Sequence, residues 1–223
     1  MRYETFARGL IRRNRTAGAH VFQDEQDDYL VSEGVFSPSV FNDTPFFAQA
    51  LPVPSGGTVL EIGCGAGVIA LAAARGGAGS VLATDVSGVA VTNSQANVDR
   101  AGLGDVIEVR QSDVFDRIAP DEQFDLIFWN CPYLAAPRDD SDSLECSVFD
   151  PGYLSIGRYL RDAPSHLAPG GRVMLSFSQT CGDRALMAQR AEQAAAELSV
   201  VATRSNFDGA WVVELLEATY PTH

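Results

Sequence analysis

Short apolar runs and longer amphipathic stretches alternate along the chain from about residue 58 onward. Each apolar run is rich in β-branched residues and is bounded by glycine, proline or polar residues, which is the pattern of a buried strand. Strands are predicted in this way at 58–62, 80–84, 106–110, 124–129 and 172–178. Helices are predicted at 68–75, 88–101, 153–167 and 183–198. This alternation is typical of an open, mostly parallel sheet with helices on both faces.

Two further apolar runs, at 200–205 and 209–217, predict an antiparallel pair that closes the sheet. They bring the expected number of strands to seven. We therefore predict the α/β class, with a doubly wound, mostly parallel seven-stranded sheet. In such sheets a ligand lies outside the carboxyl ends of the strands, so residues at those ends are the first candidates for a site.

The residues before this alternation predict a small appendage. Residues 1–15 have the pattern of a helix with apolar residues on one side and arginines on the other. Asp43 is a suitable N-cap for a further helix at 44–51. The predicted organisation is an N-terminal helical extension or lid, residues 1–35, followed by an α/β domain, residues 36–223.

Size and composition restrict the class of protein. A chain of 223 residues suits one α/β domain with a real core. No apolar run is long enough to span a bilayer, and we expect no signal peptide. The four cysteines are scattered without a C-x-x-C pair, which is a poor zinc signal and fits a reduced cytoplasm. We interpret His20 as structural, and we expect neither a metal nor a membrane partner.

The net charge of −13 disfavours nucleic-acid partners, because phosphate contacts supply most of that affinity. The first fifteen residues are an exception, with five arginines against the single Glu4. These arginines form either a solvated basic helix face or a contact with an acidic partner or with the domain's own acidic surface.

The stretch T-V-L-E-I-G-C-G-A-G-V, residues 58–68, predicts a strand, a tight turn and the start of a helix. Gly63, Gly65 and Gly67 allow the backbone of the turn to approach a ligand closely. The spacing G-x-G-x-G differs from the dinucleotide fingerprint, and no G-K-[ST] of a P-loop follows. The turn therefore predicts a nucleotide-sized cradle without naming its ligand.

Acidic residues at the ends of the next two strands favour a nucleoside cofactor. Asp85 follows the second strand, where a carboxylate can accept both hydroxyl groups of a ribose. Asp113 closes the third strand, placed to meet an adenine amino group, with Val114 beside the ring.

The fourth strand ends in Asn130-Cys131-Pro132-Tyr133. Over residues 34–178 the sequence resembles class I S-adenosylmethionine-dependent methyltransferases. It is most similar to the subgroup with an Asn-Pro-Pro-Tyr motif, which includes release-factor glutamine methyltransferases and adenine and guanine amino methyltransferases. The stretch S-P-S-V-F-N-D-T at 37–44 also resembles the segment before the first strand in the glutamine-modifying members.

The resemblance implies a Rossmann-like fold, with S-adenosyl-L-methionine as cofactor and S-adenosyl-L-homocysteine as product. It also implies the site residues. The cofactor-binding set is Glu61, Gly63, Cys64, Gly65, Gly67, Asp85, Val86, Asp113, Val114 and Asn130. The catalytic set, around the methyl acceptor, is Asn130, Cys131, Pro132 and Tyr133.

The chemistry of the motif can be stated independently. The nitrogen of a planar amide is a poor nucleophile because its lone pair is delocalised. Asn130 Oδ1 and the Cys131 carbonyl could each accept one N–H of the acceptor, which would hold that nitrogen in line with a methyl donor. Pro132 restricts Cys131 to an extended conformation, and Tyr133 offers a flat face for stacking.

Cys131 departs from the family pattern, since proline is usual there. It is either a neutral replacement or a redox-active or nucleophilic thiol. The motif as a whole could also be a structural turn in a methyltransferase of another acceptor class.

The following segment is acidic around Arg138, with Asp139, Asp140, Asp142, Glu145 and Asp150. It is either a solvated loop or a pocket rim that favours a neutral or cationic acceptor.

The sequence thus predicts a cytoplasmic S-adenosylmethionine-dependent N-methyltransferase. Its acceptor would be an amide, amine or guanidine nitrogen of a small molecule, peptide or protein side chain. A metabolite or peptide is favoured over a release factor, because the region before residue 35 is short. Two alternatives stay open: an RNA or DNA base (adenine or guanine amino) N-methyltransferase that uses the arginine-rich N-terminus, and a catalytically silent partner subunit that binds the cofactor.

Overall fold

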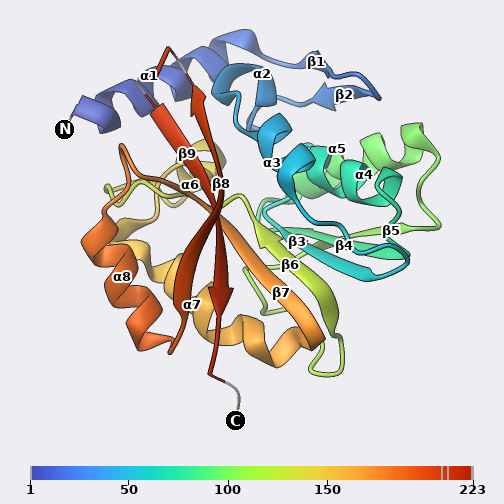
Figure 1. Ribbon diagram of the computed structural model, residues 1–223. Coiled ribbons are helices and arrows are strands. Elements are labelled where there is room, and N and C mark those ends of the chain that lie inside the picture. Colours follow the sequence, from blue (N-terminus) through green and yellow to red (C-terminus); the bar gives the residue numbers. More distant parts are fainter. Residues whose placement is uncertain (1, 207, 210, 222–223) are drawn as a thin grey trace.

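The computed structural model describes residues 2–206, 208–209 and 211–221. Within these residues, seven strands form one sheet in the order β5-β4-β3-β6-β7-β9-β8 (Figure 1). The strands are β3 (Thr58–Ile62), β4 (Ser80–Asp85), β5 (Ile107–Gln111), β6 (Phe124–Trp129), β7 (Leu167–Ser178), β8 (Glu197–Asn206) and β9 (Trp211–Thr219). The strands β3 to β7 run parallel, and β9 is antiparallel to both of its neighbours. The predicted α/β class and mostly parallel seven-stranded sheet are confirmed.

Helices cover both faces of the sheet (Figure 1). One face carries α3 (Thr44–Ala50), α4 (Val68–Arg75) and α5 (Gly88–Ala101), and the other carries α7 (Leu154–Asp162) and α8 (Arg184–Gln193). Because both faces are covered, the central strands are buried along almost their whole length; in β6 every residue except Asp125 is buried. Among the described residues, no helix combines the length and apolar composition needed to cross a membrane.

The N-terminal residues fold onto the α/β domain. They form α1 (Arg2–Ala17), a hairpin of β1 (His20–Gln23) and β2 (Asp28–Val31), and the short helix α2 (Pro38–Phe41). The hairpin is attached to α5, because the Leu30 amide donates to Asn97 Oδ1 at 2.8 Å. His20 bonds through Nε2 to Ser37 Oγ at 2.8 Å, in agreement with a structural role. The division of the chain at residue 35 stays a prediction.

Several predicted boundaries are wrong. The helix expected at 183–198 ends at Gln193, because Ala195 adopts a φ of 53° and β8 begins at Glu197. The alanines at 194–196 favour a helix locally, but pairing of β8 with β9 overrides that preference. The helix expected at 153–167 is α7 flanked by 3-10 turns at Pro151–Tyr153 and Ala163–His166.

The predicted capping role of Asp43 is also wrong. Asp43 precedes α3, but its side chain accepts no hydrogen bond from the first turn of that helix. The carboxyl group instead is buried, with only 4% of the residue exposed. Asp43 belongs to the site described next.

Candidate active site

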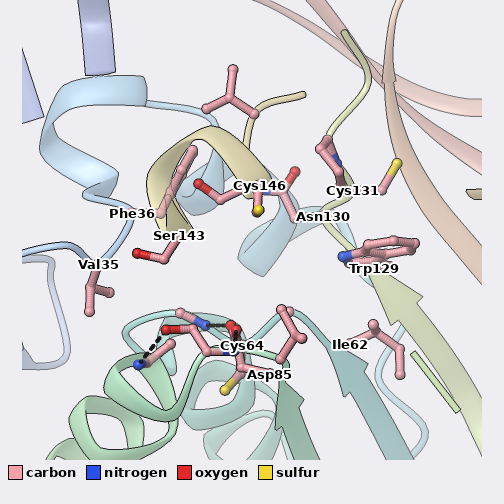
Figure 2. Close-up of a pocket in the computed structure, with 18 of the residues that line it drawn as sticks. Val35, Phe36, Ile62, Cys64, Asp85, Trp129, Asn130, Cys131, Ser143 and Cys146 are labelled. Atoms are coloured by element: carbon pink, nitrogen blue, oxygen red, sulfur yellow. Dashed lines mark hydrogen bonds between the residues drawn. The ribbon is translucent and has the colours of Figure 1, made fainter. Parts of the chain in front are cut away.

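A cavity of about 530 Å³ lies at the carboxyl ends of β3, β4, β5 and β6. All the predicted site residues line it except Gly67. Figure 2 shows Cys64 and Asp85 on one side of the cavity, with Phe36, Ser143 and Cys146 on the opposite side. The topology thus brings the ends of four strands and two connecting segments to one place.

The glycine turn lies at the base of this cavity. Gly63, Gly65 and Gly67 have φ values of 68°, 54° and 80°, in the region that favours glycine. A Cβ on Gly63 would come within 2.8 Å of Trp129 Nε1, and one on Gly67 within 2.6 Å of Ser94 Oγ. A Cβ on Gly65 would meet no atom within 4 Å, so Gly65 leaves open space beside the turn for a ligand.

Asp85 supports the glycine turn from the end of β4. Its Oδ2 accepts the Gly65 amide at 3.0 Å, and its Oδ1 accepts the Ser87 amide at 2.9 Å. Burial raises the pKa of the Asp85 carboxyl, and these amides oppose the rise. Each carboxylate oxygen keeps capacity for a further donor, as binding of a ribose would require.

Glu61 lies beneath the turn with an unpaired oxygen. The residue is 3% exposed, and its Oε2 is buried without a hydrogen-bond partner. Burial raises the pKa of this carboxyl group well above its ordinary value. A buried polar atom of this kind calls for a partner, and a polar cofactor at the cradle would supply one. These hydrogen-bond acceptors therefore fit a nucleoside cofactor with a charged amino acid portion.

Asp113 has a partner that the sequence did not reveal. Arg158 on α7 donates to Asp113 Oδ2 at 2.8 Å and to Asp116 Oδ1 at 2.7 Å. The Asp113 side chain remains 49% exposed, so its other oxygen is open to a ligand. Val114 is buried with a φ of 51°, which is strained for a β-branched residue. Arg158 lies on an ordinary helix, where no motif points to it.

The acceptor motif follows β6. Asn130 is partly buried in the cavity wall, and Cys131 is buried. The Cys131 thiol donates to Ser176 O at 3.0 Å, while the Ser176 hydroxyl donates to the Cys131 carbonyl at 3.3 Å. Burial raises the pKa of the Cys131 thiol to about 12. The thiol is therefore neutral near pH 7, which favours the neutral-replacement interpretation over a nucleophile.

Tyr133 is fixed by two residues that the sequence did not indicate. Its hydroxyl donates to Asp43 Oδ2 at 3.3 Å and accepts from Trp211 Nε1 at 3.1 Å. The Trp211 ring lies edge-on to Tyr133, with centroids 6.2 Å apart. Burial raises the pKa of Tyr133 well above its ordinary value. Asp43 and Trp211 reach the site only through folding, from opposite ends of the chain.

The acidic rim loop, residues 135–149, is attached to α1. Arg8 donates to Glu145 Oε1 at 2.8 Å and to Pro137 O at 2.7 Å, and its guanidinium lies 4.6 Å from the Phe149 ring centroid. Arg15 forms a salt bridge with Asp142. Two of the N-terminal arginines therefore bind the domain's own acidic surface, which is one of the interpretations left open above.

Comparison with known proteins identifies the family. Residues 28–208 match the family described as "Methyltransferase small domain". This chain belongs to that family. It is a methyltransferase domain. Solved structures of the same fold contain S-adenosylhomocysteine or AdoMet.

Several curated relatives carry names that mention glutamine. The release factor glutamine methyltransferase of Rhodopirellula baltica is 34% identical over 131 residues, which are 54% of this methyltransferase and 44% of the relative. A putative protein N5-glutamine methyltransferase of Methanocaldococcus jannaschii is also 34% identical over 131 residues, 56% of this chain and 64% of the relative. The chain spans about half the length of the curated relatives it matches.

Solved structures share the fold of this methyltransferase. The ribosomal protein L11 methylase of Lactobacillus delbrueckii subsp. bulgaricus has a TM-score of 0.61 at 21% identity, over 87% of this chain and 89% of that one. The 16S rRNA N2 G1207 methyltransferase of T. thermophilus was solved with AdoMet and guanosine. It has a TM-score of 0.61 at 19% identity, over 91% of this chain and 50% of that one. Protein and RNA methylases thus share this architecture.

Proposed function

We propose that the chain transfers a methyl group from S-adenosylmethionine to the side-chain amide nitrogen of glutamine in a peptide or protein. The observation that carries the proposal is that one cavity is lined both by the glycine turn and by the motif residues Asn130 and Cys131. The relatives named for glutamine methylation support the choice of nitrogen.

In this proposal the glycine turn, Glu61, Asp85 and Asp113 hold the cofactor. Gly65 leaves room for it, and Glu61 Oε2 meets its amino group as a charge-assisted partner. Asp85 accepts the ribose hydroxyl groups while it continues to hold the Gly65 amide. The Asp113 oxygen that is turned away from Arg158 accepts the adenine amino group.

Two hydrogen-bond acceptors of the chain orient the substrate amide. When bound, the cofactor supplies a methyl group on a positively charged sulfur. Asn130 Oδ1 and the Cys131 carbonyl accept the two N–H groups of a primary amide and hold its nitrogen toward the cofactor end of the cavity. The same two oxygens favour the positive charge that develops on the nitrogen. The proton leaves to water after transfer, so no buried base is needed.

Charge argues against the nucleic-acid alternative. Arg8 and Arg15, which could have met phosphates, are paired with Glu145 and Asp142 of the rim loop. The loop beside the acceptor end carries Asp139, Asp140 and Asp142, which repel a phosphate backbone.

Transfer of tritiated methyl groups from S-adenosylmethionine tests the proposal. The panel holds a glutamine peptide, the matched asparagine peptide, a lysine peptide, free glutamine and total RNA. We expect label on the glutamine peptide above all others, because the asparagine amide is one methylene shorter and falls short of Asn130. Label on RNA alone would contradict the proposal, and failure to bind S-adenosylhomocysteine would favour a silent partner subunit.

The variant Asn130→Ala separates the two halves of the site. It removes one acceptor of the substrate N–H while it leaves the glycine turn and Asp85 intact, so turnover should fall on the order of a hundredfold or more. The affinity for S-adenosylhomocysteine, measured by calorimetry, should change by less than about threefold. A parallel loss of both would mean that Asn130 belongs to the cofactor site.

A further inference from the structure

Arg138 is a cation in the wall of the cavity that the proposed mechanism does not use. Of the described residues, two arginines line the cavity, Arg138 and Arg158. The guanidinium of Arg158 is committed to two aspartates that follow β5. Arg138 comes from the rim loop, and its side chain is mostly buried, with 19% exposed. Its charge is therefore available on the acceptor side of the protein.

The chain satisfies the Arg138 guanidinium only in part. Nε donates to Asp140 Oδ1 at 2.8 Å, and Nη1 donates to Phe149 O at 2.6 Å. An arginine has five N–H groups, so three of them remain, including both on Nη2. Among the described residues Nη2 has no partner, and it is not a buried atom. A guanidinium with open N–H groups in a cavity wall is suited to a planar anion such as a carboxylate.

The bond between Arg138 and Asp140 is easily exchanged. Asp140 uses one oxygen, and its side chain is 85% exposed, so the ion pair is worth about 1 kcal/mol or less. The other carboxylates in and beside the rim loop have partners of their own: Asp139, Asp142, Glu145 and Asp150. In the described part of the chain, none of these four accepts a hydrogen bond from Arg138.

Arg138 is held beside the acceptor motif. Leu134, the residue after Tyr133, forms an isolated parallel bridge with Phe149. The carbonyl of Phe149 is the group that binds Arg138 Nη1, so the guanidinium is attached to the backbone pair that continues the motif. The carbonyl of the preceding residue, Pro137, accepts a hydrogen bond from α1 at 2.7 Å. Backbone contacts on both sides thus fix the guanidinium near the residues that would bind the methyl acceptor.

We propose that Arg138 is a specificity residue that binds a carboxylate of the methyl acceptor, and that Asp140 is its partner until this carboxylate arrives. The inference rests on the proposed function for the amide end of the acceptor, whereas binding of a carboxylate by Arg138 does not depend on methyl transfer. The carboxylate has two possible sources in a glutamine peptide. One is the α-carboxylate of a C-terminal glutamine, and the other is the side chain of an acidic neighbour.

Asp140 makes the binding weaker than Arg138 alone would make it. Its carboxylate occupies one N–H group of the guanidinium and repels a second negative charge. Asp140→Asn should therefore strengthen the binding of a carboxylate, whereas Arg138→Gln should weaken it. General loosening of the rim loop would change binding in the same direction in both variants. The opposite signs thus separate recognition from a purely structural role.

Nuclear magnetic resonance of the whole chain with S-adenosylhomocysteine tests the site without methyl transfer. The Nε–H signal of Arg138, assigned with Arg138→Lys, is followed during titration with N-acetylalanine, which carries a carboxylate but no side-chain amide. The matched probe is N-acetylalaninamide, which is uncharged. We expect a saturable shift with N-acetylalanine alone, with a Kd on the order of 10 mM or lower, and a lower Kd in Asp140→Asn. No saturable shift, or equal shifts with both probes, would overturn the inference.

Methyl transfer to two matched pairs of peptides identifies the source of the carboxylate. The first pair ends in glutamine, as the free acid and as the amide. The second pair is amidated and carries aspartate or asparagine directly after the glutamine. We expect kcat/KM to be on the order of tenfold higher for the charged member of one pair, through a lower KM. The first pair would identify the α-carboxylate and the second an acidic neighbour. Equal values within both pairs would reject the role of Arg138.

Variants connect this preference to the guanidinium. Arg138→Gln should lower kcat/KM for the preferred peptide on the order of tenfold, to the value of its uncharged match. Arg138→Lys should restore part of the preference, because lysine keeps the charge but lacks the planar fork. Arg161→Gln is the control, since Arg161 forms an exposed ion pair with Asp162 on α7 and does not line the cavity; it should keep the preference.

The outcomes distinguish this inference from the proposed function. A preference that survives in folded Arg138→Gln would reject Arg138 as its source. A saturable N-acetylalanine titration without transfer to any glutamine peptide would leave Arg138 as proposed and reject only the acceptor. If Arg138→Gln does not fold, the titrations of the wild type and of Asp140→Asn decide.

Discussion

Asp85 performs two tasks with one carboxyl group. It holds the Gly65 amide at 3.0 Å and the Ser87 amide at 2.9 Å, and it is the proposed acceptor for the ribose. These two hydrogen bonds therefore offset part of the free-energy cost of burying the carboxylate before any ligand binds. The same residue shapes the turn and offers charge to the cofactor.

Removal of this carboxyl group should thus affect the cofactor twice. In Asp85→Ala the ribose loses its charge-assisted partner and the Gly65 amide loses its acceptor, so the Kd for S-adenosylhomocysteine should rise on the order of a hundredfold. Titration calorimetry measures the change. An unchanged Kd would show that the ribose binds elsewhere.

Two glycines of one turn make a matched pair of variants. A Cβ on Gly67 meets the buried Ser94 Oγ at 2.6 Å, whereas a Cβ on Gly65 meets no atom within 4 Å. Both residues have positive φ, so both variants carry a backbone strain of about 1 kcal/mol. Gly67→Ala should therefore lower the free energy of unfolding further than Gly65→Ala, by roughly 1–3 kcal/mol of overpacking.

Cofactor affinity should show the reverse order. The added methyl group of Gly65→Ala enters the space assigned to the ligand, so this variant should bind S-adenosylhomocysteine roughly tenfold more weakly than the wild type. Urea unfolding and calorimetry on both variants make the comparison. Equal effects of the two substitutions on both quantities would refute the assignment of Gly65 to the cradle.

At the scale of elements, the two halves of the site differ in how they could be predicted. The glycine turn, Asp85, Asp113 and the residues after β6 are each the direct continuation of a strand, so a pattern of strands was enough to find them. Asp43, Arg158 and Trp211 come from a helix start, a helix and a distant strand, and only packing brings them to the cavity. The rule that capping residues precede helices was misleading at Asp43, because burial beside Tyr133 decided its side-chain position.

Helix α1 is an element whose role became visible only in the fold. Arg8 connects it to the rim loop through Glu145, Pro137 and Phe149, and Asn14 Nδ2 donates to Val35 O at 3.0 Å. Val35 and the rim-loop residues Ser143 and Cys146 line the cavity (Figure 2). One helix therefore contacts two separate segments that line the cavity, the rim loop and the segment around Val35.

Loosening α1 should loosen the rim loop without unfolding the domain. Arg8→Ala should cost about 1 kcal/mol of stability, because the Arg8 side chain is partly exposed and its ion pairs are screened. Amide hydrogen exchange of residues 138–149 should become faster. The increase should exceed the one expected from the loss of about 1 kcal/mol in global stability. Arg12→Ala, on the exposed side of the same helix, is the control. Equal exchange in both variants would mean that α1 does not hold the loop.

At the scale of the whole molecule, three buried carboxyl groups surround one cavity. Burial raises the pKa values of Asp43, Glu61 and Asp85. Between the ordinary carboxyl pKa and these raised values, the folded chain binds protons that the unfolded chain has lost. The free energy of unfolding therefore falls as pH rises through this window.

The melting temperature of the unliganded chain should accordingly fall as the pH rises above the ordinary carboxyl range. Glu122 and Glu217 act in the opposite sense, because their arginine partners lower their pKa values, but their contribution is lost only at pH values below the ordinary carboxyl range. Glu61→Gln, which removes one of the three charges, should flatten the dependence. A melting temperature that rises as the pH increases above the ordinary carboxyl range would contradict the assignment of the three groups.

The separation along the chain between interacting residues differs sharply between the two halves of the cavity. Gly65 and Asp85 are 20 residues apart, whereas Tyr133 and Trp211 are separated by 78 and Arg8 and Glu145 by 137. Closing a longer loop costs more chain entropy, so contacts of high separation form late in folding. During folding, the part of the cavity that is proposed to bind the methyl donor would therefore form before the part that is proposed to select the methyl acceptor. Selectivity, unlike donor binding, would be among the last properties that a newly made copy acquires.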